Sequence, residues 1–221
     1  DELCHSYTNL CVPTHTRQQW LRSRYGFECT CTRCKGAAYQ GADVDALMEQ
    51  VVVEEAMVDA EAAENDGGDG VDTKLALSES ALMRAEQCGD PREAQRLIQQ
   101  AVAIRRRHCH PLSLLRYHAE SALCSHALML GDEATARECG SHAISFLEMA
   151  LAHVPWHPSL SVDRMHHACS EAAVGSKAEG LRQMELCVPA LLLTHGEDHA
   201  LTQRAIAVRR ALRRHVRGVG V

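Results

Sequence analysis

Residues 110–159 read HPLSLLRYHAESALCSHALMLGDEATARECGSHAISFLEMALAHVPWHPS, a pattern typical of two helices with a short joint. The joint is Gly131-Asp132, because glycine is favoured just after a helix and aspartate caps the start of the next one. The second half places apolar side chains three and four residues apart, as on one helix face; they are Cys139, Ala143, Phe146, Leu147 and Ala150. The stretch therefore predicts a helix pair.

The opening of this stretch recurs along the chain. His110-Pro111-Leu112, His157-Pro158-Ser159 and His199-Ala200-Leu201 each open a helical pattern, at spacings of 47 and 42 residues. Gly175 divides the second unit as Gly131 divides the first. Helix pairs repeated at this period predict a stacked array in which each pair buries its apolar face on its neighbours. The concave side of such an array commonly binds extended peptides.

Helix signals also lie on both sides of the two units. Residues 74–87 read as a helix that stops at Gly89, and the next helix begins at Asp90-Pro91-Arg92-Glu93 with the spacing of a capping box. Pro111 is expected to open the helix that ends near Gly131. A later helix has apolar side chains at helical spacing and contains Pro189, which predicts a kink; these side chains are Leu181, Met184, Val188 and Leu191.

Two histidine pairs have a spacing that can bind zinc on one helix face. They are His153 with His157 and His195 with His199. Each pair straddles a loop with Pro or Gly and recurs at an equivalent position of the repeat. We therefore expect these histidines to form turns rather than a metal site.

The composition supports a helical fold. The chain has 221 residues, 46% hydrophobic and only 4% aromatic, so the core must consist of Ala, Leu, Val, Met and Cys. No apolar run reaches 18 residues, and we predict no membrane span and no signal peptide. The chain begins with Asp1, and Asp1-Glu2-Leu3 reads as the middle of an element, so we expect a piece of a longer protein.

Charge is distributed unevenly. Residues 36–73 contain eleven acidic residues and no basic one, in a chain of net charge −6. Residues 43–63 predict an exposed acidic helix, either solvated or an interaction surface, and residues 64–70 read as a Gly/Asp linker. The C-terminal helix is basic but has no interleaved aromatics, so a solvated helix end is favoured over nucleic-acid binding; its arginines are Arg204, Arg209, Arg210, Arg213, Arg214 and Arg217.

Nine of the eleven cysteines fall into two groups. Six occur singly in helical sequence, and their irregular spacing predicts buried free thiols in a reducing compartment; they are Cys88, Cys109, Cys124, Cys139, Cys169 and Cys187. In contrast, Cys29, Cys31 and Cys34 form a C-x-C-x2-C motif that can bring three thiolates to one zinc ion, with Arg33 and Lys35 favouring the thiolate. A redox pair is the alternative, although the βαβ context expected for it is absent.

The N-terminal region resembles the end of a SET domain and its post-SET segment, as arranged in SET-and-MYND (SMYD) protein lysine methyltransferases. The resemblance rests on Glu2-Leu3, Ser6-Tyr7, Arg17, Leu21-Arg22 and the run from Tyr25-Gly26-Phe27-Glu28 to Cys34. Residues 192–199, LLTHGEDH, resemble the late part of that family's tetratricopeptide-like domain. The acidic middle is the least similar part. The implied order is residues 1–35 for SET and post-SET, 36–72 for the acidic helix and linker, and 73–221 for the helical repeat.

The resemblance implies roles for the matched residues. Tyr7 and Tyr25 would be catalytic, as aromatic walls of the lysine channel, and Tyr7 and Phe27 would contact the cofactor S-adenosylmethionine. Zinc would be bound by Cys29, Cys31 and Cys34. The substrate would be a lysine of a histone or another protein, and the location cytoplasmic and nuclear. In the simpler interpretation, these aromatic residues pack in a core.

Some family elements are missing from this sequence. It contains no early SET glycine-rich segment, no Asn-His-Ser-Cys stretch, which supplies the fourth zinc ligand in the family, and no MYND finger. The fourth ligand would then be Cys4, Cys11 or His5, and we expect the chain alone to be inactive. The alternative function is a helical-repeat adaptor that retains a SET remnant and binds a peptide such as a heat-shock chaperone tail.

Overall fold

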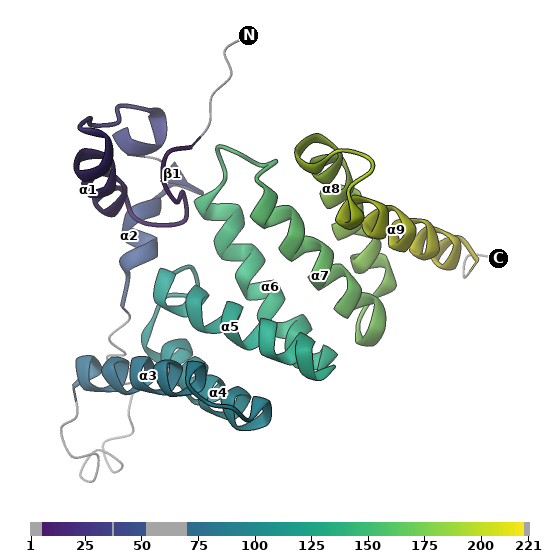
Figure 1. Cartoon of the computed structure of the whole chain (residues 1–221), viewed down its shortest axis with the longest axis horizontal. Coiled ribbons are helices and arrows are strands. Elements are labelled where there is room, and N and C mark those ends of the chain that lie inside the picture. Colours follow the sequence, from purple (N-terminus) through teal and green to yellow (C-terminus); the bar gives the residue numbers. More distant parts are fainter. Residues whose placement is uncertain (1–5, 37, 52–69, 219–221) are drawn as a thin grey trace.

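The computed structural model describes residues 6–36, 38–51 and 70–218, which form a small N-terminal module beside a row of long helices (Figure 1). The N-terminal module comprises α1 (Thr14–Tyr25), a 3-10 turn (Thr32–Lys35), β1 (Ala38–Tyr39), β2 (Ala42–Asp43) and α2 (Val44–Glu49). The row comprises α3 (Val71–Glu86), α4 (Pro91–His108), α5 (Leu114–Leu130), α6 (Glu133–Ala150), α7 (Pro158–Val174), α8 (Lys177–His195) and α9 (Ala200–Gly218).

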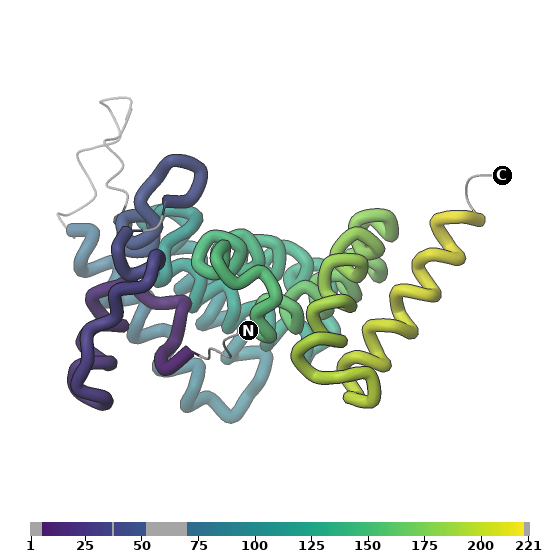
Figure 2. The backbone as a smooth tube through the Cα atoms, turned by 90° about the horizontal axis from the view of Figure 1, so that it is seen from above, coloured from purple at the N-terminus to yellow at the C-terminus, as the bar shows by residue number. Residues whose placement is uncertain are grey.

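Helices α3 to α9 form an antiparallel, tetratricopeptide-like array. Each helix packs mainly on the helices before and after it in the sequence, and Figure 2 shows the succession along the length of the molecule. The predicted fold class, mainly α with a helix-pair array, is confirmed. In the described ranges, no helix has both the length and the apolar character needed to cross a membrane.

The joints predicted between the helices are found. Gly131 follows α5 in a left-handed conformation with φ 71°, which glycine adopts without steric strain, and the Asp132 side chain accepts from the backbone N–H of Thr135 at 3.1 Å. Gly175 separates α7 from α8. Pro189 lies inside α8, as expected.

Two helix starts differ from the prediction. Asp90 caps α4 by accepting from the Arg92 N–H at 2.9 Å, but the Glu93 carboxylate bonds to Arg96 instead of completing a capping box. Helix α5 begins at Leu114 rather than at Pro111. Its N-cap is Ser113, whose hydroxyl accepts from the Arg116 N–H. A serine hydroxyl can satisfy a free N–H at the start of a helix, whereas the proline side chain has no acceptor, so the helix begins after Ser113.

The three repeat histidines share one backbone contact. The Nδ1 atom of His110 accepts from the N–H of Leu112 at 3.1 Å, and His157 and His199 accept from the N–H two residues ahead at 3.3 and 3.2 Å. This contact satisfies a backbone donor at each turn. The turn role expected for His157 and His199 is therefore found, and the contact requires Nδ1 to be unprotonated.

The acidic segment differs from its prediction. Helix α2 does begin after Asp43, whose carboxylate caps it, but it ends at Glu49 and buries Val44 and Met48. The chain then becomes extended because its backbone pairs with the array: the Gln50 carbonyl accepts from the His110 N–H at 3.1 Å, and Val51 forms a bridge with Cys109. Residues 52–63 of the predicted helix, and most of the predicted linker, lie outside the described residues.

An apolar cluster fixes the N-terminal module to the array. Val44 and Met48 of α2 are buried with Phe146 and Leu147 of α6. Tyr117 of α5 stacks on Phe146, with ring centroids 4.3 Å apart. Two further clusters occupy the α3–α6 region and the α7–α9 region, so each part of the row has its own buried apolar side chains.

We predict that Gly180→Ala destabilises the array. A Cβ atom at Gly180 of α8 would lie 2.9 Å from the backbone carbonyl of Ala168 in α7, so the two helices must separate. Overpacking of this kind costs about 1–3 kcal/mol. Urea denaturation measures the loss, and Gly89→Ala, where the added Cβ meets open space, is the control. Equal stability of the two variants would contradict the close approach.

We also predict that acid weakens the array through its turn histidines. Burial lowers the pKa of His157. The pKa of His110 is lowered mainly by burial and also by the positive charge of the nearby Arg116. Below about pH 6.5 the unfolded chain then binds more protons than the folded one, so stability falls as pH falls. Asp163 has the opposite effect on stability. Burial raises its pKa to about 6, so the folded chain binds this proton more tightly than the unfolded chain, and the contribution of Asp163 to stability rises as pH falls.

His157→Asn isolates this effect, because asparagine caps a helix without titrating. Between pH 7 and pH 5, the free energy of unfolding of this variant should fall by about 1 kcal/mol less than that of the wild type, the size of one N-cap. Urea titrations at each pH measure it, and His215→Asn on the exposed side of α9 is the control. Parallel pH profiles for His157→Asn and the wild type would count against the role of His157.

Candidate metal centre and aromatic cluster

The end of α1 places the predicted site residues next to one another. Gly26 has φ 72° and closes the helix with a hydrogen bond from its N–H to the Arg22 carbonyl, which lets the chain turn back. The returning segment is held by Gln18, whose side-chain amide donates to the Cys29 carbonyl at 2.7 Å and accepts from the Cys29 N–H at 2.9 Å. Cys29 is therefore fixed at both of its backbone groups.

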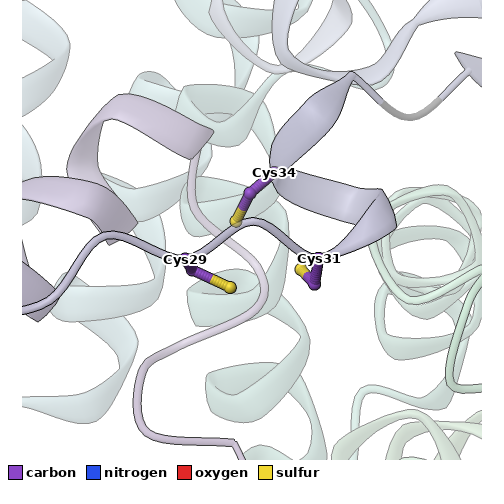
Figure 3. Close-up of side chains that lie close together, drawn as sticks. All are labelled: Cys29, Cys31 and Cys34. Carbon is purple, nitrogen blue, oxygen red and sulfur yellow. The ribbon is translucent and has the colours of Figure 1, made fainter.

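The three sulfurs converge on one point. The Sγ atoms of Cys29, Cys31 and Cys34 lie within 4.8 Å of one another and face a common space (Figure 3). Three sulfurs at the tetrahedral Zn–S distance of about 2.3 Å would lie roughly 3.8 Å apart. The group therefore fits zinc with a contraction of at most about 1 Å. Among the described residues, this is the only group of three or more Cys, His, Asp or Glu with ligand atoms this close.

The fourth ligand is not among the described Cys, His, Asp and Glu side chains near these sulfurs. Cys11 was one candidate, but it packs against the apolar cluster under the module, and burial together with the nearby Asp163 raises its pKa to about 11. The other candidates, Cys4 and His5, lie outside the described residues.

The three thiols differ in their electrostatic surroundings. Burial raises the pKa of Cys31, but hydrogen bonds from the Cys34 backbone and from the Cys29 and Cys34 side chains outweigh it, so the pKa is lowered. Burial raises the pKa of Cys34 to about 11, against the opposing effect of Arg17.

One of the two cations predicted beside the group is engaged elsewhere, and a third cation lies against the group. The sequence suggests Arg33, but its buried side chain turns away and donates to the Asp45 carboxylate at 2.9 Å. Arg17 of α1 lies against the cysteines instead, with Nη2 donating to Cys34 Sγ at 3.7 Å. Sequence reasoning missed this role because Arg17 lies 17 positions from Cys34, and only the reversal at Gly26 brings them together.

The three predicted aromatic residues also form one cluster. The ring of Tyr7 contacts those of Tyr25 and Phe27 edge-on, with centroids 5.3 and 6.1 Å away, and Tyr25 and Phe27 are 6.4 Å apart. These distances are typical of interacting aromatic pairs. The rings remain 41–49% exposed, so the cluster is a surface wall rather than a core. A shallow hollow of about 520 Å³ lies beside Tyr7 and Trp20.

The six scattered cysteines are free thiols that are buried or half-buried, as predicted. Burial raises the pKa of Cys109, Cys124, Cys139, Cys169 and Cys187. Such thiols are inert packing groups.

The basic helix α9 is partly neutralised. Glu185 of α8 accepts from Arg213 at 2.6 and 2.8 Å and lies 3.8 Å from Arg209. Two of the six arginines therefore pair with a carboxylate on the neighbouring helix.

Comparison with known proteins gives little further information. No protein-family model and no curated protein matches the chain. Two solved structures of a Podosopora anserina kinesin light chain with nearly identical TPR-like repeats are similar to it. One of them, a form with a single substitution, is 21% identical over 62% of this chain and 63% of its own, with a TM-score of 0.47. The other is 20% identical over 65% and 67%, with a TM-score of 0.46. The fold assignment therefore rests on the helix packing described above.

We predict that the purified chain binds one equivalent of Zn²⁺ or Co²⁺ through the cysteine group. Replacing Cys29, Cys31 or Cys34 by serine should weaken metal binding, because a hydroxyl replaces a thiolate ligand. The loss should exceed the ~10–100-fold that is typical when a residue that only supports a ligand is replaced. Competition titration under reducing conditions measures the affinity. Cys88→Ser in the array is the control, and equal affinity of all variants would exclude this site.

Proposed function

We propose that the chain is part of an S-adenosylmethionine-dependent protein lysine methyltransferase, in which the helical array supports the N-terminal module. The single observation that supports this best is the packing of Tyr7, Tyr25 and Phe27 into one half-exposed wall, directly before three converging cysteines. The aromatic cluster contains the residues for which the SMYD resemblance implies catalysis and cofactor contact, and the cysteine group contains those for which it implies metal binding.

S-adenosylmethionine would supply the methyl group, and the chain's own residues would align the acceptor. The Tyr7 hydroxyl can hydrogen-bond a lysine amine, and the Tyr7 and Tyr25 rings can exclude water from it, because only the neutral amine attacks. Aromatic faces also attract sulfonium and ammonium cations. The described residues fit one wall of such a pocket, and the motifs for the rest are absent from the sequence.

A metal at the three cysteines would act structurally. It would tie Cys29, which follows Phe27 closely, to the turn that contains Cys34, and would thereby fix the aromatic wall on α1. No step of methyl transfer needs the metal to contact the substrate.

The second candidate is a peptide-binding adaptor, favoured by the seven-helix array in the described residues. Arrays of this kind bind extended segments of other proteins. A heat-shock chaperone tail peptide remains the proposed ligand. Fluorescence anisotropy with that labelled peptide distinguishes the candidates, since an adaptor binds it in the absence of S-adenosylmethionine.

We predict that a protein carrying this chain together with a complete cofactor pocket transfers labelled methyl groups to lysine. Tyr7→Phe should lower the rate by about 100-fold, the effect expected when a reacting group loses its alignment. Tyr39→Phe is the matched control, because Tyr39 packs against the apolar cluster instead of the aromatic wall. Equal rates for the two variants would contradict the role of Tyr7, and transfer by the 221-residue chain alone would contradict its expected inactivity.

A further inference from the structure

Arg17 is a buried cation without a carboxylate. Its side chain is 1% exposed, and its guanidinium donates to the Val12 carbonyl, to Thr14 Oγ1 at 2.6 Å and to Cys34 Sγ at 3.7 Å. The first two acceptors are neutral. Within the described ranges, no Asp or Glu lies within ion-pair distance of Arg17, whereas a buried charge is normally paired.

The nearest carboxylate already serves another arginine. Asp45 binds the Arg33 guanidinium at 2.9 Å and accepts from the Thr14 backbone N–H at 3.0 Å, so it reaches Arg17 only through Thr14. Two buried arginines and one carboxylate leave one positive charge in the interior of the module. The other charged side chains of α1, such as Arg22 and Arg24, are exposed to water.

The cysteine group can supply the missing negative charge. Three thiolates around one divalent cation carry a net charge of −1, which balances the remaining +1. Three neutral thiols leave the guanidinium uncompensated, and three thiolates without a metal leave an excess of two negative charges. With a neutral fourth ligand, the metal-bound group balances the charge of Arg17. A single metal-free thiolate beside two neutral thiols would also do so, and metal titration distinguishes the two.

We propose that Arg17 is the counter-charge of a divalent metal–thiolate centre, and that its N–H donation to Cys34 Sγ positions and stabilises that ligand. This inference rests on the metal centre of the proposed function and adds to it a residue that does not touch the metal. A purely structural Arg17, holding only Val12 and Thr14, is the competing role. Only the counter-charge role predicts that loss of Arg17 changes the electronic state of Cys34 Sγ.

The test uses the full 221-residue chain under reducing conditions, with Co²⁺ as the probe and Zn²⁺ as competitor. Arg17→Met removes the charge and the donors, and Arg17→Lys keeps the charge. Arg24→Met, on the exposed side of the same helix, is the matched control. Far-ultraviolet circular dichroism checks that the helices are retained.

We expect Arg17→Met to weaken Zn²⁺ binding by about 10–100-fold, the range for loss of a contact that supports a metal ligand. Arg17→Lys should recover most of this loss, and Arg24→Met should bind as the wild type does. In the Co²⁺-loaded Arg17→Met protein, the sulfur-to-cobalt charge-transfer band should move to lower energy, because Cys34 Sγ has lost a hydrogen-bond donor.

Three results would overturn the proposal. If Arg17→Met binds metal as tightly as Arg24→Met, Arg17 is not the counter-charge, although the metal centre stands. If affinity falls but the band does not move and Arg17→Lys recovers nothing, the role is purely structural. If the wild type binds no Co²⁺, the metal centre itself fails, and the role of Arg17 fails with it.

Discussion

The Asp45 carboxylate connects the parts of the N-terminal module. One oxygen accepts from the backbone N–H of Thr14 at the start of α1, and the other binds Arg33 between the cysteines. Asp45 itself lies on α2, whose Val44 and Met48 are buried against α6 of the array. The cysteine turn and α1 are therefore both held to a short helix that is anchored in the main core. Without this carboxylate, Arg33 would be a second buried cation without a partner. The cysteine turn and the start of α1 would then no longer be held to α2.

This arrangement separates two kinds of cysteine in one chain. In the array, thiols such as Cys139 and Cys187 fill space between helices, and burial raises their pKa, which keeps them unreactive. In the module, Cys29, Cys31 and Cys34 lie near the surface among backbone N–H groups and a guanidinium. The same side chain thus serves as a small apolar residue in one place and as a ligand in the other, according to the dielectric and charge around it.

The array was predictable from local signals, whereas much of the site was not. Glycine joints, aspartate caps and three-four apolar spacing act within a few residues, so Gly131 and Asp132 located the end of α5 and the start of α6. The site depends on contacts between distant residues. Gln18 with Cys29 and Arg17 with Cys34 are set by the reversal at Gly26, which no spacing rule encodes. The error at residues 50–51 has the same origin, because pairing with Cys109 and His110 overrides helical propensity.

The geometry of the cysteine group also bears on the choice between metal binding and redox chemistry. A disulfide joins two sulfurs, so any pair formed within Cys29, Cys31 and Cys34 leaves a third thiol in the same small space. Redox Cys-x-x-Cys pairs lie at the start of a long helix after a strand, where the helix dipole stabilises the thiolate. Here Cys34 lies in a four-residue 3-10 turn that follows an extended segment held by Gln18. Such a short turn contributes little dipole, and the local stabilisation comes from individual donors aimed at separate sulfurs. A metal ion uses all three sulfurs at once, and so it accounts for the third cysteine, which a redox pair leaves without a role.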